Sequence, residues 1–293
     1  IKRQWRRCGG LCLVRLGKRL LRYAQDKVVI EMSDLKAILK YPGGKWRIAE
    51  WIISHFPAHK VYCEPFFGSG GVFFKKRPSN IETINDINGE IVNLFRVCRE
   101  HPSELAAAIA LTPWAREEYI DCYAIEGDDI ERARRVLVRH HQSFGTTNSN
   151  LNSWKNSQTS NSPRCPAQWA ELPETIMQVC GRLKQAQIEN VDALTLIERY
   201  NDPQTLLYLD PPYLQGLRKR GIYKFEMTDE KHVELLELIK RSKSKVCLSA
   251  YDSELYNTEL KGWYTAEKPT IAQMGKPRIE KLYMNYAPDL LAF

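Results

Sequence analysis

Residues 205–213 read Thr-Leu-Leu-Tyr-Leu-Asp-Pro-Pro-Tyr, a continuous apolar run that ends on Asp210 and two prolines. An apolar run without polar alternation is typical of a central parallel strand, because such a strand is buried on both faces. Pro211 and Pro212 favour an extended backbone, so the chain leaves the strand in a rigid conformation. The stretch therefore predicts an open α/β sheet with a polar group at the carboxyl end of an inner strand.

Two further predicted strands end in polar or Gly-rich segments. Val61–Cys63 runs into Glu64–Gly71, which reads Glu-Pro-Phe-Phe-Gly-Ser-Gly-Gly, and Ile81–Asn85 is followed by Asp86. In open α/β sheets, ligands bind outside the carboxyl ends of the strands. We therefore expect these segments and Asp210 to form one site.

The remaining chain alternates between helical periodicity and strand character. Helices are predicted over Lys45–Phe56, Val72–Lys76, Ile87–Glu100, Ser103–Ala110, Ala115–Ile125, Ile130–His140, Glu174–Gln185, Val191–Tyr200 and Glu230–Ser242. Strands are predicted over Lys245–Ser249 and Ile279–Tyr286, and the Asn-, Ser- and Thr-rich stretch 145–166 is predicted to be a loop. We predict a catalytic domain from 32–89 and 201–293, with a mostly helical insertion at 90–200.

The net charge of +8 is unevenly distributed. Residues 1–31 contain nine Lys or Arg and two acidic residues, which leaves 34 basic and 33 acidic residues in the rest of the chain. Because the body is nearly neutral, a nucleic-acid surface there must be a local patch. We predict that 1–31 is a basic extension outside the folded body, with native sequence starting near Met32; a DNA-binding basic arm is the alternative.

The cysteines and the hydropathy exclude several classes of protein. The eight cysteines form no CxxC pair and no His cluster accompanies them, so neither a zinc site nor a disulfide framework is predicted. No apolar run approaches the roughly 20 residues of a membrane helix. We expect a cytoplasmic protein with reduced thiols and no metal.

The Gly-rich turn is informative through what it lacks. Its glycines let the backbone approach a ligand closely, but no Gly-Lys-Ser/Thr follows, which excludes a P-loop. Glu64 disfavours phosphate and suits a cation, and Asp86 is placed to bind ribose hydroxyls. The combination fits S-adenosylmethionine, whose sulfonium is positively charged. The alternative is that Glu64 and Asp86 only cap the helices that follow them.

Asp210–Tyr213 suits a planar amino group. The exocyclic amine of adenine has two N–H donors, which the Asp210 carboxylate and a neighbouring backbone carbonyl can accept. Tyr213 can stack on a base rotated out of a duplex, a contact worth roughly 1–3 kcal/mol. The motif therefore predicts methyl transfer to the amino nitrogen of a base, whereas a simple proline-rich turn would not explain the flanking Asp and Tyr.

These motifs resemble those of the Dam-like family of N6-adenine DNA methyltransferases, which includes many phage enzymes. The resemblance covers about residues 38–288. It rests on Lys40–Lys45 (Lys-Tyr-Pro-Gly-Gly-Lys), Glu64–Gly70, Asn85–Asn88, Asp210–Tyr213, Ser249–Ser253 and Arg278–Asn285. It implies a Rossmann-like S-adenosylmethionine-dependent methyltransferase sheet with an inserted, mostly helical target-recognition domain.

The motifs and the resemblance together assign roles to individual residues. The predicted catalytic residues are Asp210, Pro211, Pro212 and Tyr213. The predicted cofactor-binding residues are Tyr41, Lys45, Glu64, Phe66, Gly68, Ser69, Gly70, Asp86 and Asp210. The predicted DNA-binding residues are Arg139, Asn148, Asn150, Lys155, Arg218, Lys219 and Arg220, since such side chains contact phosphate or base edges. For the last group, a solvated loop is the alternative.

The expected partner is double-stranded DNA, and the resemblance implies a bacterial or phage-encoded monomer. Three alternatives stay open at this point: adenine methylation in RNA, methylation of the exocyclic amine of cytosine, and a catalytically inactive DNA-binding prophage remnant. The intact Asp210 favours adenine, because Ser is usual at this position in cytosine-directed relatives.

Overall fold

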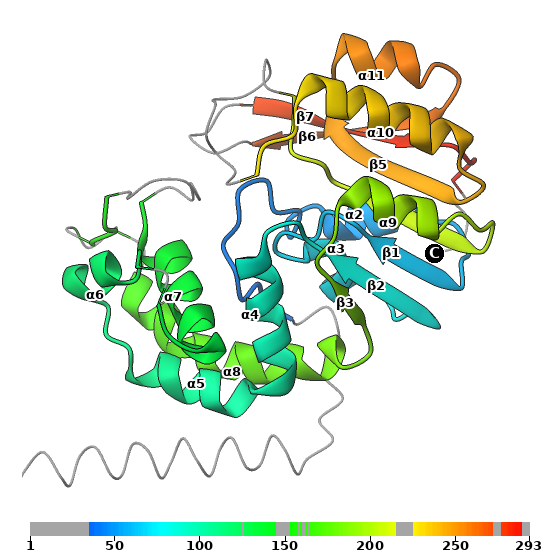
Figure 1. The fold of residues 1–293 in the computed structure, drawn as a ribbon. Coiled ribbons are helices and arrows are strands. Elements are labelled where there is room, and N and C mark those ends of the chain that lie inside the picture. Colours follow the sequence, from blue (N-terminus) through cyan, green and yellow to red (C-terminus); the bar gives the residue numbers. More distant parts are fainter. Residues whose placement is uncertain are drawn as a thin grey trace, which may run out of the picture.

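The computed structural model describes residues 35–124, 126–144, 153–157, 159, 162, 164–214, 225–271 and 277–288. Within these ranges, seven strands form one sheet of order β3-β2-β1-β4-β5-β7-β6 (Figure 1). The strands are β1 (Val61–Glu64), β2 (Ile81–Asn85), β3 (Gln187–Glu189), β4 (Thr205–Leu209), β5 (Lys245–Tyr251), β6 (Tyr264–Ile271) and β7 (Pro277–Met284). The predicted extension 1–31 lies outside the described residues.

The sheet combines a parallel part with an antiparallel edge. The pairs β1–β2, β1–β4, β2–β3 and β4–β5 are parallel, whereas β7 runs antiparallel to both β5 and β6. β1 lies between β2 and β4, so the chain winds outward in both directions from this point. Such a switch in strand order is where open α/β sheets bind ligands.

Helices cover the sheet and form a separate group beyond one end of it (Figure 1). They are α2 (Ala49–Ile53), α3 (Gly71–Lys75), α4 (Gly89–Glu100), α5 (Pro102–Leu111), α6 (Arg116–Asp121), α7 (Asp129–Gln142), α8 (Cys165–Leu183), α9 (Ala193–Arg199), α10 (Asp229–Arg241) and α11 (Glu254–Glu259). The helices α4 to α8, which form this helical group, all lie between β2 and β3 in the chain.

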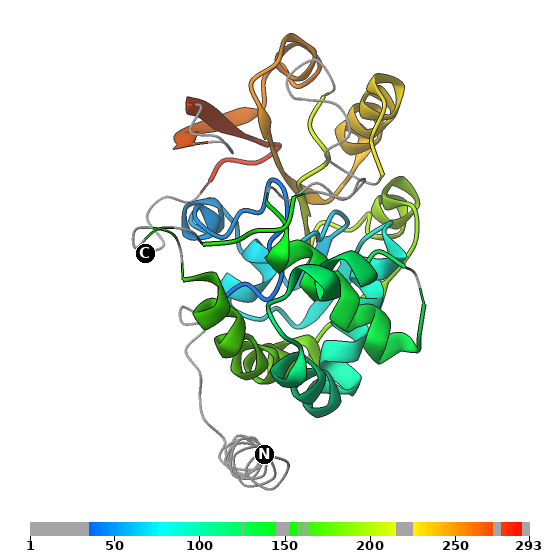
Figure 2. The same cartoon turned by 90° about the vertical axis from the view of Figure 1, so that its left-hand side faces the viewer.

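The inner strands bury both of their faces. In β4, Leu206 and Tyr208 pack on one side and Leu207 and Leu209 on the other, because successive side chains of a strand alternate. The first side is covered by α2, α3 and α4, and the second by α9, α10 and α11 (Figures 1 and 2). This two-sided burial explains the apolar runs in the sequence.

The structure changes the predicted limits of the helical insertion. Gln187–Glu189 forms β3 and pairs in parallel with β2, and α9 packs on the sheet, so both belong to the sheet domain and not to the segment 90–200. The prediction missed β3 and β6. Both are edge strands, and β6 includes Glu267, Lys268 and Pro269, residues that suit an exposed edge and hide its strand pattern. The predicted helix Lys45–Phe56 is shortened to α2.

Candidate active site

Three neighbouring strands end beside one cavity. Glu64 ends β1, Asp86 directly follows β2 and Asp210 directly follows β4. All three residues line a cavity of about 450 Å³. The structure thus brings together the strand ends that the sequence marks as chemically suggestive, because the parallel register aligns them at one edge of the sheet.

Most of the predicted cofactor-binding residues surround this cavity. Those that line it are Tyr41, Lys45, Glu64, Phe66, Gly68, Ser69, Asp86 and Asp210. Gly70 does not line it; its backbone is left-handed, with φ 68°, and forms the N-cap of α3. In the catalytic motif, Pro212 lines the cavity, whereas Pro211 and Tyr213 are buried beside it.

Glycine is required where the Gly-rich loop meets the segment around Tyr41. Gly68 has φ +50°, and a Cβ there would lie 3.0 Å from Tyr41 Cδ1. A Cβ at Gly71 would lie 2.8 Å from the backbone nitrogen of Trp46. The Trp46 indole also donates to the Ser69 carbonyl at 3.3 Å. The segment around Tyr41 and Trp46 and the Gly-rich loop therefore pack tightly against each other and form one wall of the cavity.

Glu64 is a buried acid with an unusual protonation equilibrium. Its carboxylate accepts a hydrogen bond from the Tyr62 hydroxyl at 2.6 Å, and the residue is 2% exposed. Burial raises the pKa of Glu64 to about 8, although the Tyr62 hydrogen bond opposes this shift; the nearby charge of Asp210 adds to it. A cationic ligand in the cavity would stabilise the ionised form.

Asp86 connects the Gly-rich loop to α4. Its Oδ2 accepts from the Gly68 amide at 2.9 Å and its Oδ1 from the Asn88 amide at 2.8 Å. Burial raises the pKa of Asp86 to about 6, and the two amide hydrogen bonds oppose the shift. The carboxylate therefore has a local structural role, although it does not cap the following helix as considered from the sequence, because the N-cap of α4 is Asn88. Each oxygen retains a second lone pair, so a ligand contact is compatible with that role.

Lys45 binds the catalytic motif directly. Its ammonium donates to Asp210 Oδ1 at 2.6 Å and to the Tyr213 hydroxyl at 2.6 Å. Burial lowers the pKa of Lys45, but the charges of Asp210 and Glu280 outweigh this effect and raise it. Burial raises the pKa of Asp210 to about 6, and Lys45 opposes that rise. Lys45 thus neutralises part of the charge that Asp210 carries into the cavity.

Glu280 and Ser249 complete the cluster and were not predicted as site residues. Glu280 lies on β7 and accepts from the Tyr213 hydroxyl at 3.2 and 3.1 Å and from Ser249 Oγ at 2.6 Å. It also lies 3.5 Å from Lys45 Nζ. The only sequence signal was their position within the last two motifs of the resemblance.

An aromatic pair adjoins the cluster. The rings of Tyr213 and Tyr251 stack with a centroid distance of 3.9 Å and an interplanar angle of 18°. The Arg278 guanidinium lies 5.9 Å from the Tyr251 ring centroid. Tyr251 is half-buried at the end of β5, so a second aromatic face lies next to the one supplied by the catalytic motif.

Comparison with known proteins shows the family of this chain. Residues 41–272 match the family model of the D12 class N6 adenine-specific DNA methyltransferases. The chain belongs to this family. The match includes Tyr41, the Gly-rich loop and the whole of Asp210–Tyr213, so it spans the cavity, whereas Glu280 lies beyond its end.

Individual relatives agree with the D12 assignment. The DNA adenine methylase of Salmonella typhimurium is 24% identical over 286 residues, covering 88% of this chain and 98% of that protein. The type II methyltransferase M.MjaIII of Methanocaldococcus jannaschii is 22% identical and is covered in full, with 86% of this chain. The type II methyltransferase M1.LlaDCHI of Lactococcus lactis subsp. cremoris is 28% identical over 114 residues, 40% of its length and 36% of this chain.

Solved structures give a weaker likeness. The putative methyltransferase yhhF from Escherichia coli has a TM-score of 0.35 at 12% identity, covering 86% of this chain and 92% of its own. A SAM-dependent methyltransferase from Agrobacterium tumefaciens has a TM-score of 0.33 at 11% identity, covering 82% of this chain and 59% of its own. These scores are too low to support an inference from either structure.

Among the predicted DNA-binding residues of this D12 member, Arg139 and Lys155 are described and Asn148, Asn150 and Arg218–Arg220 lie outside the described residues. The Arg139 guanidinium pairs with Glu90 at 2.5 Å. The Lys155 amide donates to the Gln142 carbonyl at 2.7 Å, and its side chain is half-buried. Arg139 is therefore engaged within the protein in this structure.

The last turn of α7 is bonded to the segment that precedes Tyr41. His140 Nδ1 donates to the Lys40 carbonyl at 2.8 Å, and its ring stacks on Tyr41 at a centroid distance of 5.9 Å. His141 Nε2 donates to the Ile38 carbonyl at 2.9 Å. Burial lowers the pKa of His140 to about 4, so the ring is neutral near pH 7. The helical group thus supports one wall of the cavity.

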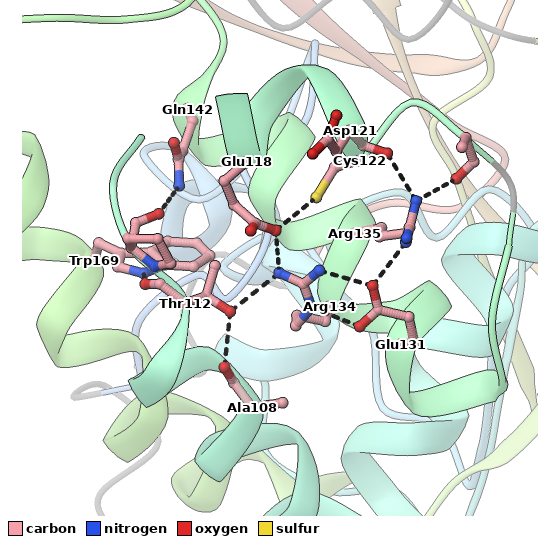
Figure 3. Close-up of polar contacts among 12 residues, drawn as sticks. Ala108, Thr112, Glu118, Asp121, Cys122, Glu131, Arg134, Arg135, Gln142 and Trp169 are labelled. Atoms are coloured by element: carbon pink, nitrogen blue, oxygen red, sulfur yellow. Dashed lines mark hydrogen bonds and ion pairs between the residues drawn. The ribbon is translucent and has the colours of Figure 1, made fainter. Parts of the chain in front are cut away.

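The helical group is itself held by a polar network (Figure 3). Arg134 on α7 donates to Glu118 Oε1 at 2.6 Å, to Glu131 and to the Thr112 hydroxyl at 3.1 Å. The Thr112 carbonyl accepts from the Trp169 indole at 2.9 Å. These contacts tie α6, α7 and α8 to the end of α5. The polar side chains involved are paired within the protein, so no ligand is needed to explain them.

Several residues that line the cavity were not predicted, among them residues that follow β2 and β3 and residues around Met227. These are Ile87, Asn88, Asp192, Ala193, Leu194, Phe225, Glu226, Met227 and Lys231. Asp192 caps α9 by accepting from the amides of Leu194 and Thr195. Asp192 follows β3, so the missed edge strand also concealed this fourth strand end.

The described residues provide neither a metal-binding cluster nor a membrane-spanning helix. No group of three or more His, Cys, Asp or Glu side chains is arranged to hold a metal ion within the described part of the chain. No helix in that same part is long and apolar enough to cross a membrane.

Proposed function

We propose that this protein transfers the methyl group of S-adenosylmethionine to the N6 amino group of adenine in double-stranded DNA. The observation that carries the proposal is the position of Asp210. It lines the cofactor-sized cavity and is followed by Pro211–Tyr213, in a chain whose family is adenine-specific. The 90–186 segment would be the target-recognition part, and the protein would act as a monomer.

The cavity fits S-adenosylmethionine in charge and size. Its volume of about 450 Å³ is within the range of small-molecule sites. The carboxyl groups of Glu64, Asp86 and Asp210 would face the positive sulfonium and ammonium and the ribose hydroxyls. Gly68 lets the Tyr41 ring pack against the loop, since a Cβ there would lie 3.0 Å from that ring. Apolar side chains of the lining, such as Ile87, Leu194 and Met227, would contact the purine. When bound, the cofactor supplies an electrophilic methyl group.

Asp210 would hold the acceptor amine. Its Oδ1 accepts a hydrogen bond from the Lys45 ammonium. Its other oxygen would accept one N–H of the amine, and a backbone carbonyl of the motif would accept the second N–H. This arrangement would direct the nitrogen lone pair at the methyl group. The amine gains positive charge as the new bond forms, and a carboxylate in a buried site stabilises such charge. A proton leaves the nitrogen after transfer, and Asp210 is its nearest acceptor.

Tyr213 and Tyr251 would receive the base. Their rings are in contact, so a base that enters between them must first separate the pair. Aromatic pairs contribute about 0.5–1.5 kcal/mol, whereas stacking of a base on an aromatic ring contributes about 1–3 kcal/mol. The exchange is therefore favourable or neutral, and the main cost is extraction of the base from the duplex.

Methyl transfer from radiolabelled cofactor tests the proposal. The acceptors are genomic DNA without N6-methyladenine, the same DNA denatured, and RNA, each digested to nucleosides after reaction. We expect label in N6-methyladenine from duplex DNA only. Label in N4-methylcytosine or in RNA would show that the acceptor is one of the alternatives. No label in any acceptor would refute the proposed methyltransferase activity.

The Asp210→Ala variant tests the assignment of the site. Loss of the carboxylate removes a contact that acts on the reacting nitrogen, so we expect the transfer rate to fall by at least about 100-fold. The variant should lose some stability but still unfold cooperatively, because Lys45 keeps Glu280 as a partner. Transfer near the original rate in a folded variant would show that the acceptor site lies elsewhere.

A further inference from the structure

Glu280 is a buried carboxylate that lies outside the cavity, so contact with a bound cofactor does not account for it. It is 3% exposed, lies on β7 and does not line the cavity. A buried charge is costly unless it is paired and hydrogen-bonded. Glu280 meets this condition with three partners: Lys45, Tyr213 and Ser249. Lys45 is bonded to Asp210, and Tyr213 belongs to the same motif as Asp210, so the carboxylate is joined to the reaction centre.

The antiparallel register explains how Glu280 reaches the motif. Glu280 pairs with Tyr251 across β5 and β7, and paired residues project side by side from one face of a sheet. Tyr251 contacts the face of the Tyr213 ring, while Glu280 accepts from the Tyr213 hydroxyl. Ser249 is two residues before Tyr251 on the same strand face and donates to Glu280 at 2.6 Å. The ring of Tyr213 is therefore held at its face and at its oxygen.

Glu280 also shares the charge of Lys45 with Asp210. The Lys45 ammonium lies 2.6 Å from Asp210 Oδ1 and 3.5 Å from Glu280 Oε1. One ammonium between two carboxylates leaves a net negative charge beside the acceptor site. Without Glu280, Lys45 would neutralise Asp210 more completely, and Asp210 would accept the amine less strongly.

We propose that Glu280 is a positioning residue for methyl transfer, which fixes the phenol of Tyr213 and divides the charge of Lys45 so that Asp210 can hold the amine. This inference rests on the proposed function. A structural role alone is a poor explanation, because buried ion pairs contribute little net stability compared with apolar residues of similar volume. Because Glu280 does not line the cavity, its loss should act on the rate and not on cofactor binding.

The experiment compares Glu280→Ala, Glu280→Gln and Ser249→Ala under single-turnover conditions with saturating cofactor and duplex DNA. Small displacements at a reaction centre reduce rates by roughly 10–100-fold, and we expect a loss of that size for Glu280→Ala. Glu280→Gln should recover part of the rate, since its amide oxygen can still accept from Tyr213. Ser249→Ala should cause a smaller loss. Cofactor affinity, measured by calorimetry, should stay within about threefold of the unchanged protein in all three.

A matched control separates positioning from general stability. Glu82 is a buried carboxylate on β2 that pairs with Lys76 and Arg182 away from the cavity. Glu82→Gln should lower the melting temperature and leave the transfer rate per folded molecule unchanged. If Glu280→Ala does not fold, Glu280→Gln and Ser249→Ala carry the test.

Folded Glu280 variants with rates within about threefold of the unchanged protein would overturn the inference, as would a rate loss fully accounted for by weaker cofactor binding. Both outcomes require active unchanged protein. They therefore differ from a failure of the proposed function, in which the unchanged protein itself methylates no adenine.

Discussion

Replacing Glu64 by Gln removes one carboxyl group from the cavity wall and keeps an acceptor for the Tyr62 hydroxyl. Glu64 is buried at the end of β1, and burial raises its pKa to about 8. The side chain is therefore mostly protonated at pH 7 in the empty protein. If the ionised form is needed to bind the positive charge of S-adenosylmethionine, binding must remove this proton.

The cost of ionising Glu64 sets the size of the effect. Each pH unit below the pKa costs about 1.4 kcal/mol. With a pKa of about 8, cofactor affinity should be about tenfold weaker at pH 7 than above pH 9, and it should rise as the pH increases. The pKa values of Asp86 and Asp210 are about 6, so these groups add to the slope only near and below that pH. The window from pH 7 to 9 therefore isolates Glu64.

Calorimetric titration with S-adenosylmethionine, without DNA, measures this profile. The Glu64→Gln variant reports the titration of the cofactor's own amino group, so the difference between the two proteins belongs to Glu64. We expect a steep profile for the unchanged protein, and weaker, flatter binding for the variant. Identical pH profiles for both proteins would refute the reasoning, because Glu64 would then not change its protonation on binding.

Three further predictions follow from local geometry. Gly68→Ala forces a side chain into a left-handed backbone that already contacts Tyr41, so cofactor affinity should fall by about tenfold or more, with little change in the rate at saturation. His140→Ala removes the support of Tyr41 and of the Lys40 carbonyl, and calorimetry should show a severalfold loss of cofactor affinity that His140→Phe partly restores through its ring. The pKa of Glu64 is raised on folding, so its contribution to stability is present below its ordinary pKa of 4.5 and is lost as the pH rises through about 8; thermal melting of the empty protein at pH 9 should therefore show Glu64→Gln to be more stable than the unchanged protein.

Local sequence was sufficient for the inner sheet and its strand ends. The strands β1, β2, β4 and β5 were all predicted, and β4 was the clearest because a strand buried on both faces is a continuous apolar run. Parallel pairing then brings Glu64, Asp86 and Asp210 to one edge whatever the side-chain details. The short β3 and the charged β6 were missed because an edge strand is not buried on both sides.

The sequence by itself determined the fold class, the family and the acidic cavity edge, because these depend on burial patterns and motifs that lie within short stretches of chain. Only the tertiary structure decided what surrounds the catalytic motif. Lys45 contacts Asp210 across 165 positions, and Glu280 contacts Tyr213 across 67. These contacts depend on strand order and on the antiparallel register of β5 and β7, in which a shift of one residue would turn Glu280 to the opposite face. No local pattern encodes that register.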